Sequence, residues 1–339
     1  MTLKELACAA FVAAGSVAAF ADTPALAQNA TPPDPGPSAD SYVSAAGSDD
    51  NFCTISKPCM TIGHAIGRTM KEGTVHCLDS LGNDALSITQ SITIDCSNTT
   101  ARVAGISING SNLSVYLIGL ELIGQGTGIK FNTGAAVFVK NCKFYMVASA
   151  IYVGSGFTPN SGPIQLYVAD TDITESNYGL FLQPIETNVT ATFINVNITN
   201  NGHGLLMTPS AGSVTATFQN VRIIQNRDDG IKTDSTGGPV VVDIADSVIS
   251  SNAGNGVSAG SDGKRDNTTS ISRSIIGGNG SAGVRADGAT SQVLADTTLL
   301  DNNSAGAISA TGGARVLTYH TNRIVGSAGT GFNGSAPLQ

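Results

Sequence analysis

Residues 195–226 read NVNITNNGHGLLMTPSAGSVTATFQNVRIIQN, and this stretch contains one full period of a repeat. Asn195 and Asn201 recur 25 residues further on as Asn220 and Asn226. Between the two pairs, residues 214–218 alternate apolar and polar side chains, which predicts a short β-strand with one buried side. A period this short leaves no room for a crossover helix, so it favours a coil of short strands.

The two asparagine positions belong to two columns that run through much of the chain. Members of the first column are 23 to 27 residues apart: Asp170, Asn195, Asn220, Asp246, Arg273, Asp296 and Thr321. Members of the second column lie six residues later: Ser176, Asn201, Asn226, Asn252, Asn279, Asn302 and Ser327. A glycine followed by an apolar residue recurs in step with both columns, at Gly128–Ile129, Gly179–Leu180, Gly204–Leu205, Gly230–Ile231, Gly256–Val257 and Gly283–Val284.

These columns predict a parallel solenoid in which each strand pairs with the strands one turn above and below, at about 4.8 Å. An asparagine in the same turn of successive coils can stack its amide on its neighbour's and bond local backbone. We therefore expect the second column to have a structural rather than a ligand-binding role.

The composition argues against several classes of protein. With 41% hydrophobic residues and a net charge of −8, the 339-residue chain has enough apolar material for a core and is not expected to be disordered. Only 12% of the residues are charged, which argues against a bundle of helices with solvated charged faces. The 17 Lys and Arg residues against 25 Asp and Glu offer no basic face for nucleic acid. After the N-terminal segment, no apolar run is long enough to span a membrane.

The first 40 residues are predicted to contain an export signal followed by a linker. Lys4, an apolar run over residues 6–20 and the small residues of Ala25-Leu26-Ala27 predict a secretory signal peptide over residues 1–27. Four prolines within residues 28–40 predict an extended linker. We therefore expect a secreted or periplasmic protein, in which disulfides can persist.

Five cysteines follow the predicted signal peptide. Cys53 and Cys59 flank a short loop and are the strongest candidates for a disulfide. Cys77 and Cys96 each end a strand-like run. They could form a second disulfide or be two buried, unpaired thiols, and the sequence leaves both alternatives open. Cys142 is then expected to be a small core residue. The Cys and His spacing is too loose for a zinc site, and no metal is expected.

Residues 42–53, YVSAAGSDDNFC, and 58–66, PCMTIGHAI, resemble the N-terminal cap of secreted right-handed parallel β-helix proteins of the pectin-lyase-like superfamily. The likeness extends in particular to an uncharacterised bacterial exported group with the same paired cysteines. Ile62, Ile66, Thr69 and Met70 are spaced like one face of a helix over residues 61–72. The resemblance implies that this helix plugs the first coil and shields an open sheet edge.

The expected fold is therefore all-β: a right-handed parallel β-helix of about ten coils with an N-terminal capping helix. The expected segments are a cap over residues 41–72 (strand, disulfide loop and helix), the β-helix over residues 73–332 and a tail over residues 333–339.

Two local patterns resemble polygalacturonases, which are glycoside hydrolases. The segment around His203, Asn-Gly-His-Gly-Leu, is similar to their Gly-His-Gly segment, and Asp228-Asp229 is similar to their paired aspartates. An inverting hydrolase needs one carboxyl as acid and another as base. In that family, however, the aspartates precede the Gly-His-Gly segment, and an Arg-Ile-Lys element follows that is absent here. These departures disfavour hydrolysis.

A polysaccharide lyase would need a basic side chain to take a proton from C5 of a uronate, with calcium to neutralise the carboxylate. The candidates are Arg227, Lys232, Arg265 and Arg285, with Asp228, Asp229, Asp234 and Asp262 nearby in the sequence. Lys232 and Arg285 are expected to point outward from the same strand face, two coils apart. Solvated surface charges would produce the same pattern.

The position after each glycine–apolar pair should also point outward. It is occupied by Lys130, Tyr152, Phe181, Leu206, Lys232, Ser258 and Arg285, with Ala150 in place of the glycine before Tyr152. Tyr152, Phe181 and Leu206 are thus predicted to form an apolar stripe on consecutive coils, able to stack sugar rings or seat a partner. The alternative is that residues 154–163, with Phe157, fold over the stripe and cover it.

Taken together, the sequence predicts a non-enzymatic module of the cell envelope or extracellular space that contacts polysaccharide or another surface and needs no cofactor. A polysaccharide lyase or glycoside hydrolase acting on an acidic polysaccharide is the alternative, with calcium implied only for the lyase.

Overall fold

The computed structural model describes residues 34–154, 162–326 and 331–337. The chain divides into two units, Met1–Asp34 and Pro35–Gln339. The predicted signal peptide and residues 28–33 of the predicted linker lie outside the described residues. The predicted segment boundaries in that part of the chain stay predictions.

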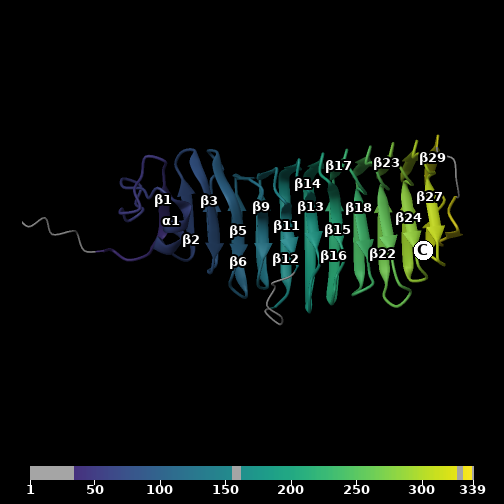
Figure 1. The fold of residues 1–339 in the computed structure, drawn as a ribbon, viewed down its shortest axis with the longest axis horizontal. Coiled ribbons are helices and arrows are strands. Elements are labelled where there is room, and N and C mark those ends of the chain that lie inside the picture. Colours follow the sequence, from purple (N-terminus) through teal and green to yellow (C-terminus); the bar gives the residue numbers. More distant parts are fainter. Residues whose placement is uncertain (1–33, 155–161, 327–330, 338–339) are drawn as a thin grey trace, which may run out of the picture. The chain divides into compact units, whose positions relative to one another are not determined.

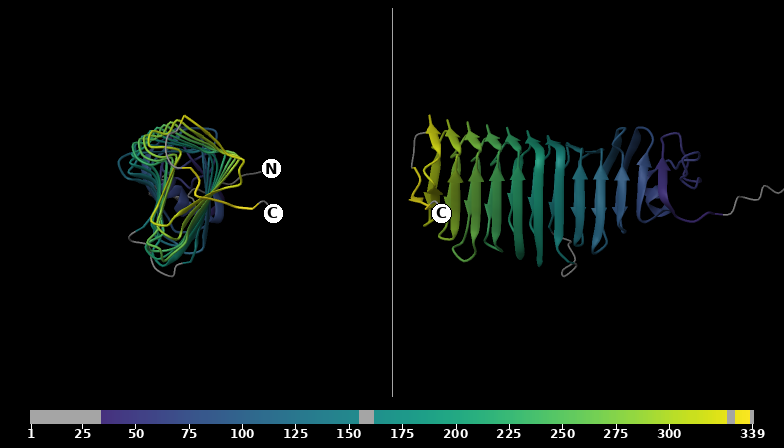
Figure 2. Two further views of the ribbon diagram at one scale, coloured as in Figure 1. Left: turned by 90° about the vertical axis from the view of Figure 1, so that its right-hand side faces the viewer. Right: turned by 180° about the vertical axis from the view of Figure 1, so that it is seen from behind.

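The second unit is a parallel solenoid of about nine turns, close to the ten expected (Figures 1 and 2). Its strands form three faces, which we call face 1, face 2 and face 3. Each named strand pairs in parallel with its counterpart on the neighbouring turn, as for β14 with β16 and β15 with β18. The predicted solenoid is confirmed.

Face 1 contains β1 (Ser38–Val43), β2 (Thr69–Cys77), β4 (Ile92–Asp95), β6 (Leu113–Ile118), β9 (Ala135–Lys140), β12 (Ile164–Thr174), β14 (Thr187–Thr199), β16 (Gly212–Gln219), β19 (Val240–Ala245), β22 (Asn267–Ser272), β25 (Ser291–Asp296), β28 (Arg315–Thr318) and β30 (Gly334–Ser335). The last of these strands lies in the expected tail and pairs with β28.

Face 2 is narrow, with strands of three or four residues and the second halves of β12 and β14. Its other strands are β7 (Leu120–Ile123), β10 (Lys143–Tyr145), β17 (Arg222–Ile224), β20 (Val248–Ser250), β23 (Ile275–Gly277), β26 (Leu299–Asp301) and β29 (Arg323–Val325). Face 3 contains β8 (Thr127–Phe131), β11 (Ser149–Val153), β13 (Tyr178–Leu182), β15 (His203–Met207), β18 (Ile231–Asp234), β21 (Val257–Gly260), β24 (Val284–Asp287) and β27 (Ile308–Thr311). Near the N-terminal end, β3 (Leu81–Ile88) and β5 (Ala101–Ile108) bend from face 2 into face 3.

The core fills the inside of the coil with rows of Val, Ile, Leu and Phe. Alternate residues of the strands are buried, as in β16, where Val214, Ala216 and Phe218 point inward. Phe193 and Phe218 stack inside the coil with ring centroids 4.9 Å apart. Because each turn buries its apolar residues against the next, the repeat supplies one continuous core.

The first column lies at the sharp bend between face 1 and face 2. Asn195 and Asn220 have φ angles of 56° and 54°, in the left-handed region that asparagine tolerates better than most residues. Asn220 Nδ2 donates to Asn195 Oδ1 at 2.7 Å, which links the bends of two turns. Two members of the column do not share this conformation, since the left-handed residues are Thr297 rather than Asp296 and His320 rather than Thr321.

The second column forms a buried ladder of asparagines: Asn201, Asn226, Asn252, Asn279 and Asn303. Asn226 Nδ2 donates to Asn252 Oδ1 at 2.9 Å, and the Asn226 backbone N–H donates to the same oxygen at 3.1 Å. The predicted stacking and backbone bonding are confirmed, with one error. Asn302 is exposed and left-handed, and Asn303 takes its place because each ladder residue follows the left-handed residue of its bend. Ser327 lies outside the described residues.

The helix of the cap is shorter than expected. α1 (Ile62–Arg68) begins after Thr61, whose Oγ1 accepts a hydrogen bond from the His64 N–H at 3.1 Å. It buries Ile62, Ala65 and Ile66. The chain becomes extended at Thr69, and β2 starts there rather than at residue 73, so Thr69 and Met70 are not helical. The expected linker residues 38–40 likewise belong to β1, which pairs with β2.

Both candidate disulfides are present. Cys53 pairs with Cys59 and Cys77 with Cys96, with Cα atoms 4.6 and 4.7 Å apart. Cys142 is a free, buried thiol, as expected, and burial raises its pKa to about 11. In the described part of the chain, no helix has the length and apolar character needed to cross a membrane.

Candidate functional site

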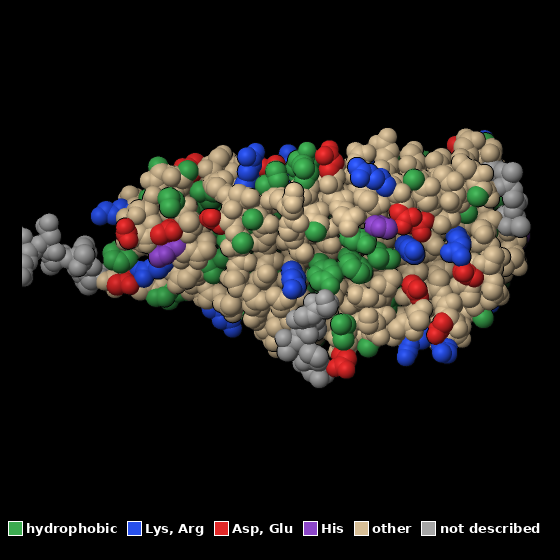
Figure 3. Space-filling view, viewed as in Figure 1, with side chains coloured by type: hydrophobic (Ala, Val, Ile, Leu, Met, Phe, Trp, Pro, Cys, Tyr) green, Lys and Arg blue, Asp and Glu red, His purple; other side chains and the backbone are tan. Residues whose placement is uncertain are grey.

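The outward row of face 3 has the register expected from the sequence. Lys130 is the partner of Tyr152, Tyr152 of Phe181, Phe181 of Leu206 and Leu206 of Lys232. The row continues through Ser258 to Arg285. Successive members lie on neighbouring strands about 4.8 Å apart. Figure 3 shows hydrophobic side chains gathered on this region, with histidine and charged side chains beside them toward the C-terminal end.

Tyr152 and Phe181 of this row, together with Tyr178 and His203 beside it, form four aromatic rings in sequential contact. The Tyr152 and Phe181 ring centroids lie 5.4 Å apart, and those of Phe181 and Tyr178 lie 5.0 Å apart. The Tyr178 ring stacks on the His203 ring at 4.6 Å with an angle of 8° between the planes. Each of these side chains is half-buried, as is Leu206. Tyr178 and His203 therefore extend the predicted stripe of Tyr152, Phe181 and Leu206, and from here on the stripe means these five residues. It crosses three consecutive turns and is partly exposed to solvent.

Tyr178 was missing from the predicted stripe because the strand departs from simple alternation. Gly179 and Leu180 are both buried, so Tyr178 and Phe181 point outward although they are three residues apart. The glycine column explains this, since the turns approach each other too closely there for a side chain. A Cβ at Gly230, for example, would lie 2.7 Å from the Gly256 carbonyl oxygen. The recurring glycine is the sequence feature that could have predicted this arrangement, but a prediction from alternation alone does not take it into account.

The residues that resemble polygalacturonases are brought together only in part. His203 Nδ1 lies 2.8 Å from Asp228 Oδ2, so these two side chains form a pair at the end of the stripe. Asp229 is buried, and its Oδ1 accepts hydrogen bonds from the backbone N–H and Nδ2 of Asn255 at 2.6 and 2.8 Å. Arg227 is exposed in the same bend. Asp229 therefore holds two turns together and does not face the stripe as a second free carboxylate.

Four of the charged lyase candidates, Lys232, Asp234, Asp262 and Arg285, line a shallow groove that continues the stripe. The groove encloses about 230 Å³ and is lined by Lys232, Thr233, Asp234, Thr236, Ser258, Gly260, Ser261, Asp262, Arg285 and Asp287. Its lining has two basic and three acidic side chains. Arg285 Nη2 lies 2.9 Å from Asp287 Oδ2, whereas Lys232 is exposed. Arg265 is exposed beyond the groove and is not part of its lining.

The predicted cover of the stripe, residues 154–163, lies largely outside the described residues. Phe157 and the rest of residues 155–161 are not described. The described end of that segment shows that the Tyr152 ring lies against Gly154, where a Cβ would collide with the phenol group.

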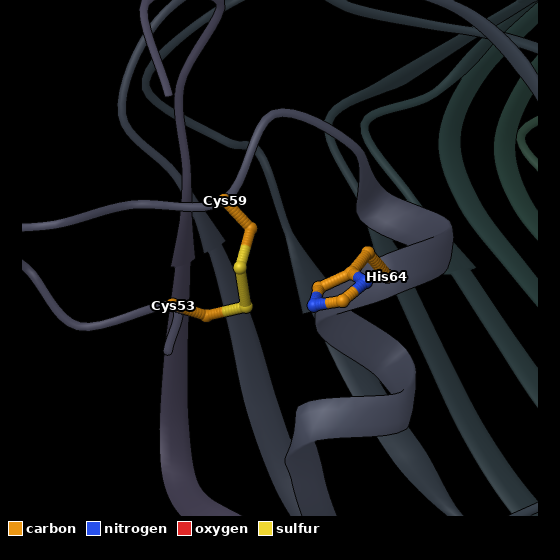
Figure 4. A group of neighbouring side chains, drawn as sticks. All are labelled: Cys53, Cys59 and His64. Carbon is orange, nitrogen blue, oxygen red and sulfur yellow. A yellow bond between two sulfur atoms is a disulfide. The ribbon is translucent and has the colours of Figure 1, made fainter. Parts of the chain in front are cut away.

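A separate group of potential ligand atoms lies in the cap. Cys53, Cys59 and His64 bring two sulfurs and a ring nitrogen within 4.8 Å of one another (Figure 4). The two sulfurs are bonded to each other, and a disulfide offers no thiolate to a metal ion. The closeness of these atoms is therefore explained by the disulfide of the cap and does not indicate a metal site.

Comparison with known proteins supports the fold. A family model described as "Right handed beta helix region" matches residues 178–336. No curated protein matches the chain. The crystal structure of pectate lyase Pel9A aligns with a TM-score of 0.50 and 15% identity, covering 88% of this chain and 78% of that chain. A rhamnogalacturonan lyase structure aligns with a TM-score of 0.42 and 14% identity, covering 77% of this chain and 74% of that chain. Identities this low bear on the fold and not on the activity.

Proposed function

We propose that this chain, a right-handed β-helix repeat protein with a pectin-lyase-like fold, binds a polysaccharide along face 3 without cleaving it. The observation that carries the proposal is the run of contacting rings from Tyr152 to His203 across consecutive turns. The two disulfides support a secreted or periplasmic location, because such bonds persist in oxidising compartments.

The stripe has the chemistry that sugars require. The exposed parts of the rings offer an apolar surface to the C–H groups of a pyranose, and Tyr152 and Tyr178 also carry a hydroxyl for hydrogen bonds. The run crosses from β11 to β13 at Phe181 and from β13 to β15 at Tyr178, with one step along β13 between them. Its rings therefore cover three turns and fit an extended chain laid obliquely across the strands rather than a single compact ligand. Lys232 lies next to Leu206 at the end of the stripe and offers a cation to a carboxylate on the chain.

The described side chains support binding better than cleavage. Asp229 is occupied by Asn255, which leaves Asp228 without a second free carboxylate for an acid–base pair. Arg285, one of the two bases in the groove, is held by Asp287. A guanidinium in an ion pair is a poor base for abstracting a proton.

A polysaccharide lyase is the second candidate, and the groove is the observation that favours it. Lys232 is an exposed base, and Asp234, Asp262 and Asp287 line the same groove. Carboxylate oxygens are the donor type that calcium prefers, so these residues suit the ion that a lyase of uronate polymers would use. Bound calcium would neutralise the uronate carboxylate, and Lys232 would take the proton.

A single experiment separates these functions. Neutral and acidic polysaccharides are arrayed and titrated against the protein, while the absorbance of the unsaturated product of lyase cleavage is followed with and without calcium. We expect binding without product, and we expect Phe181→Ala to weaken binding by about tenfold because a stacked ring is lost. Tyr145→Ala, which removes a ring from β10 on face 2, is the matched control and should bind like the unmodified protein.

Two results would overturn the proposal. The first is product formation that is lost in Lys232→Ala or Arg285→Ala, which would make the chain a lyase. The second is the absence of binding to every polysaccharide of the array.

A further inference from the structure

Face 1 has an aromatic run of its own, separate from the stripe of face 3. Tyr116, Phe138 and Tyr167 occupy the same outward register position on β6, β9 and β12. The Tyr116 and Phe138 rings stack at 4.5 Å with 7° between their planes, and the Phe138 and Tyr167 rings lie 6.2 Å apart. Tyr116 is 41% exposed and Tyr167 36% exposed, and they are the most exposed tyrosine or phenylalanine side chains in the described part of the chain.

A groove of about 260 Å³ lies against the last two rings of this run. It is lined by Val137, Phe138, Gln165, Leu166, Tyr167, Thr190 and Thr192. Its walls therefore combine two rings with an amide and two hydroxyl groups, and its lining contains no charged side chain. On the next turn, Thr215 and Thr217 continue the two threonine positions in register.

We propose that this groove is a second glycan site, which binds an uncharged polysaccharide. Phe138 and Tyr167 provide an apolar surface for the C–H groups of pyranose rings, and Gln165, Thr190 and Thr192 provide donors and acceptors for sugar hydroxyl groups. The uncharged lining has nothing to pair with a uronate or a charged peptide, whereas face 3 ends in a charged groove. The chemistry of the two faces thus separates the two ligands by charge.

The geometry also favours an extended ligand over a compact one. The three rings and the threonine rows follow the solenoid axis on successive turns, about 4.8 Å apart. A linear glycan that lies across the strands would meet a ring, then the groove, then the rows of hydroxyl groups. The site does not depend on the stripe of face 3, because its residues lie on different strands.

The test uses three oligosaccharides of equal length: cellohexaose, mannohexaose and hexagalacturonate. Each is titrated calorimetrically into the unmodified protein, Tyr167→Ala, Tyr167→Phe and the face 3 variant Phe181→Ala. We expect at least one neutral hexasaccharide to bind, with affinity lowered about tenfold in Tyr167→Ala and retained in Tyr167→Phe and Phe181→Ala. We also expect this binding to be insensitive to salt, since no ion pair forms. Thermal unfolding of each variant checks that the fold is intact.

Four results would overturn the inference: no binding of either neutral sugar, tighter binding of hexagalacturonate at this groove, equal loss in Phe181→Ala, or a dimer that Tyr167→Ala dissociates. The last would identify face 1 as a surface for a second copy of the chain. Because the face 3 variant is measured beside the face 1 variants, failure here is distinguishable from failure of the proposed function.

Discussion

The buried asparagines give the solenoid much of its alignment from turn to turn. Asn252 Oδ1 accepts two hydrogen bonds from Asn226, and Asn252 Nδ2 donates to the Ile223 carbonyl oxygen at 3.1 Å. Each amide therefore bonds the backbone N–H of a neighbouring bend and a carbonyl oxygen of a face 2 strand. Such groups are costly when left unpaired in the interior.

Replacing one ladder residue should destabilise the protein. In Asn252→Leu, the N–H and Nδ2 of Asn226 lose their acceptor and the Ile223 carbonyl loses its donor, so we expect a loss of about 2–5 kcal/mol in the free energy of unfolding. Asn188→Leu makes the same chemical change at an exposed position of β14 and should cost much less. Equal urea midpoints for the two variants would contradict a role for the ladder.

The free cysteine offers a second residue test. Burial raises the pKa of Cys142 to about 11, so its thiolate, the reactive form, is scarce at neutral pH and shielded from reagents. We expect iodoacetamide to label Cys142 only after denaturation, as measured by peptide mass mapping under native and unfolding conditions. Rapid native labelling would show that the core opens around β10.

The sequence predicted the positions that the repeat period determines better than the positions that local backbone bends determine. The asparagine ladder could be predicted because asparagine recurs at a fixed offset in the sequence. The prediction was wrong at Asn302 because it used the spacing alone, whereas each ladder residue directly follows the left-handed residue of its bend. Tyr178 was missed since the close approach at Gly179 changes which side chains point outward. Whether Phe181 and Lys232 bind a ligand stays a prediction.

At the level of elements, the contacts between adjacent turns explain both the glycine column and the limits of the prediction. The pairing of strands and the outward row of face 3 followed from alternation and period. The aromatic run of face 1 was not anticipated, because Tyr116, Phe138 and Tyr167 precede the clear part of the repeat. The helix end was misplaced since Thr69 and Met70 fit a helical spacing, yet the chain becomes extended there to pair with β1.

A side chain in the glycine column should separate neighbouring strands. A Cβ at Gly230 would meet the Gly256 carbonyl oxygen at 2.7 Å, which is backbone and cannot move aside alone. We expect Gly230→Ala to lower the free energy of unfolding by about 1–3 kcal/mol through overpacking. Gly82→Ala on β3 places the same methyl group in open space and serves as the control. A stable Gly230→Ala variant would refute the close approach of β18 and β21.

The whole molecule behaves as a one-dimensional array, because each turn contacts mainly its neighbours. Its stability should therefore be shared among turns rather than concentrated in one of them. The repeated turns also explain the composition. Few charged residues are needed because the strands cover one another, and many glycines are needed because each turn bends several times.

Removing one entire turn should leave a folded protein. Deleting residues 201–225 joins Asn200 to Asn226 and preserves the left-handed residue before the ladder. We expect an unchanged β-type circular dichroism spectrum and a modest loss of stability. Deleting residues 201–212 breaks the register and should prevent folding. If both deletions unfold, the turns are not modular units.

The central claim is that face 3 binds a polysaccharide and does not cleave it. The most direct measurement is calorimetric titration of a linear acidic polysaccharide into the unmodified protein, Phe181→Ala and Lys232→Ala, with product absorbance read in the same cell. The account predicts binding that weakens about tenfold in Phe181→Ala, with no unsaturated product in any sample. Product that accumulates with the unmodified protein and disappears in Lys232→Ala would contradict it.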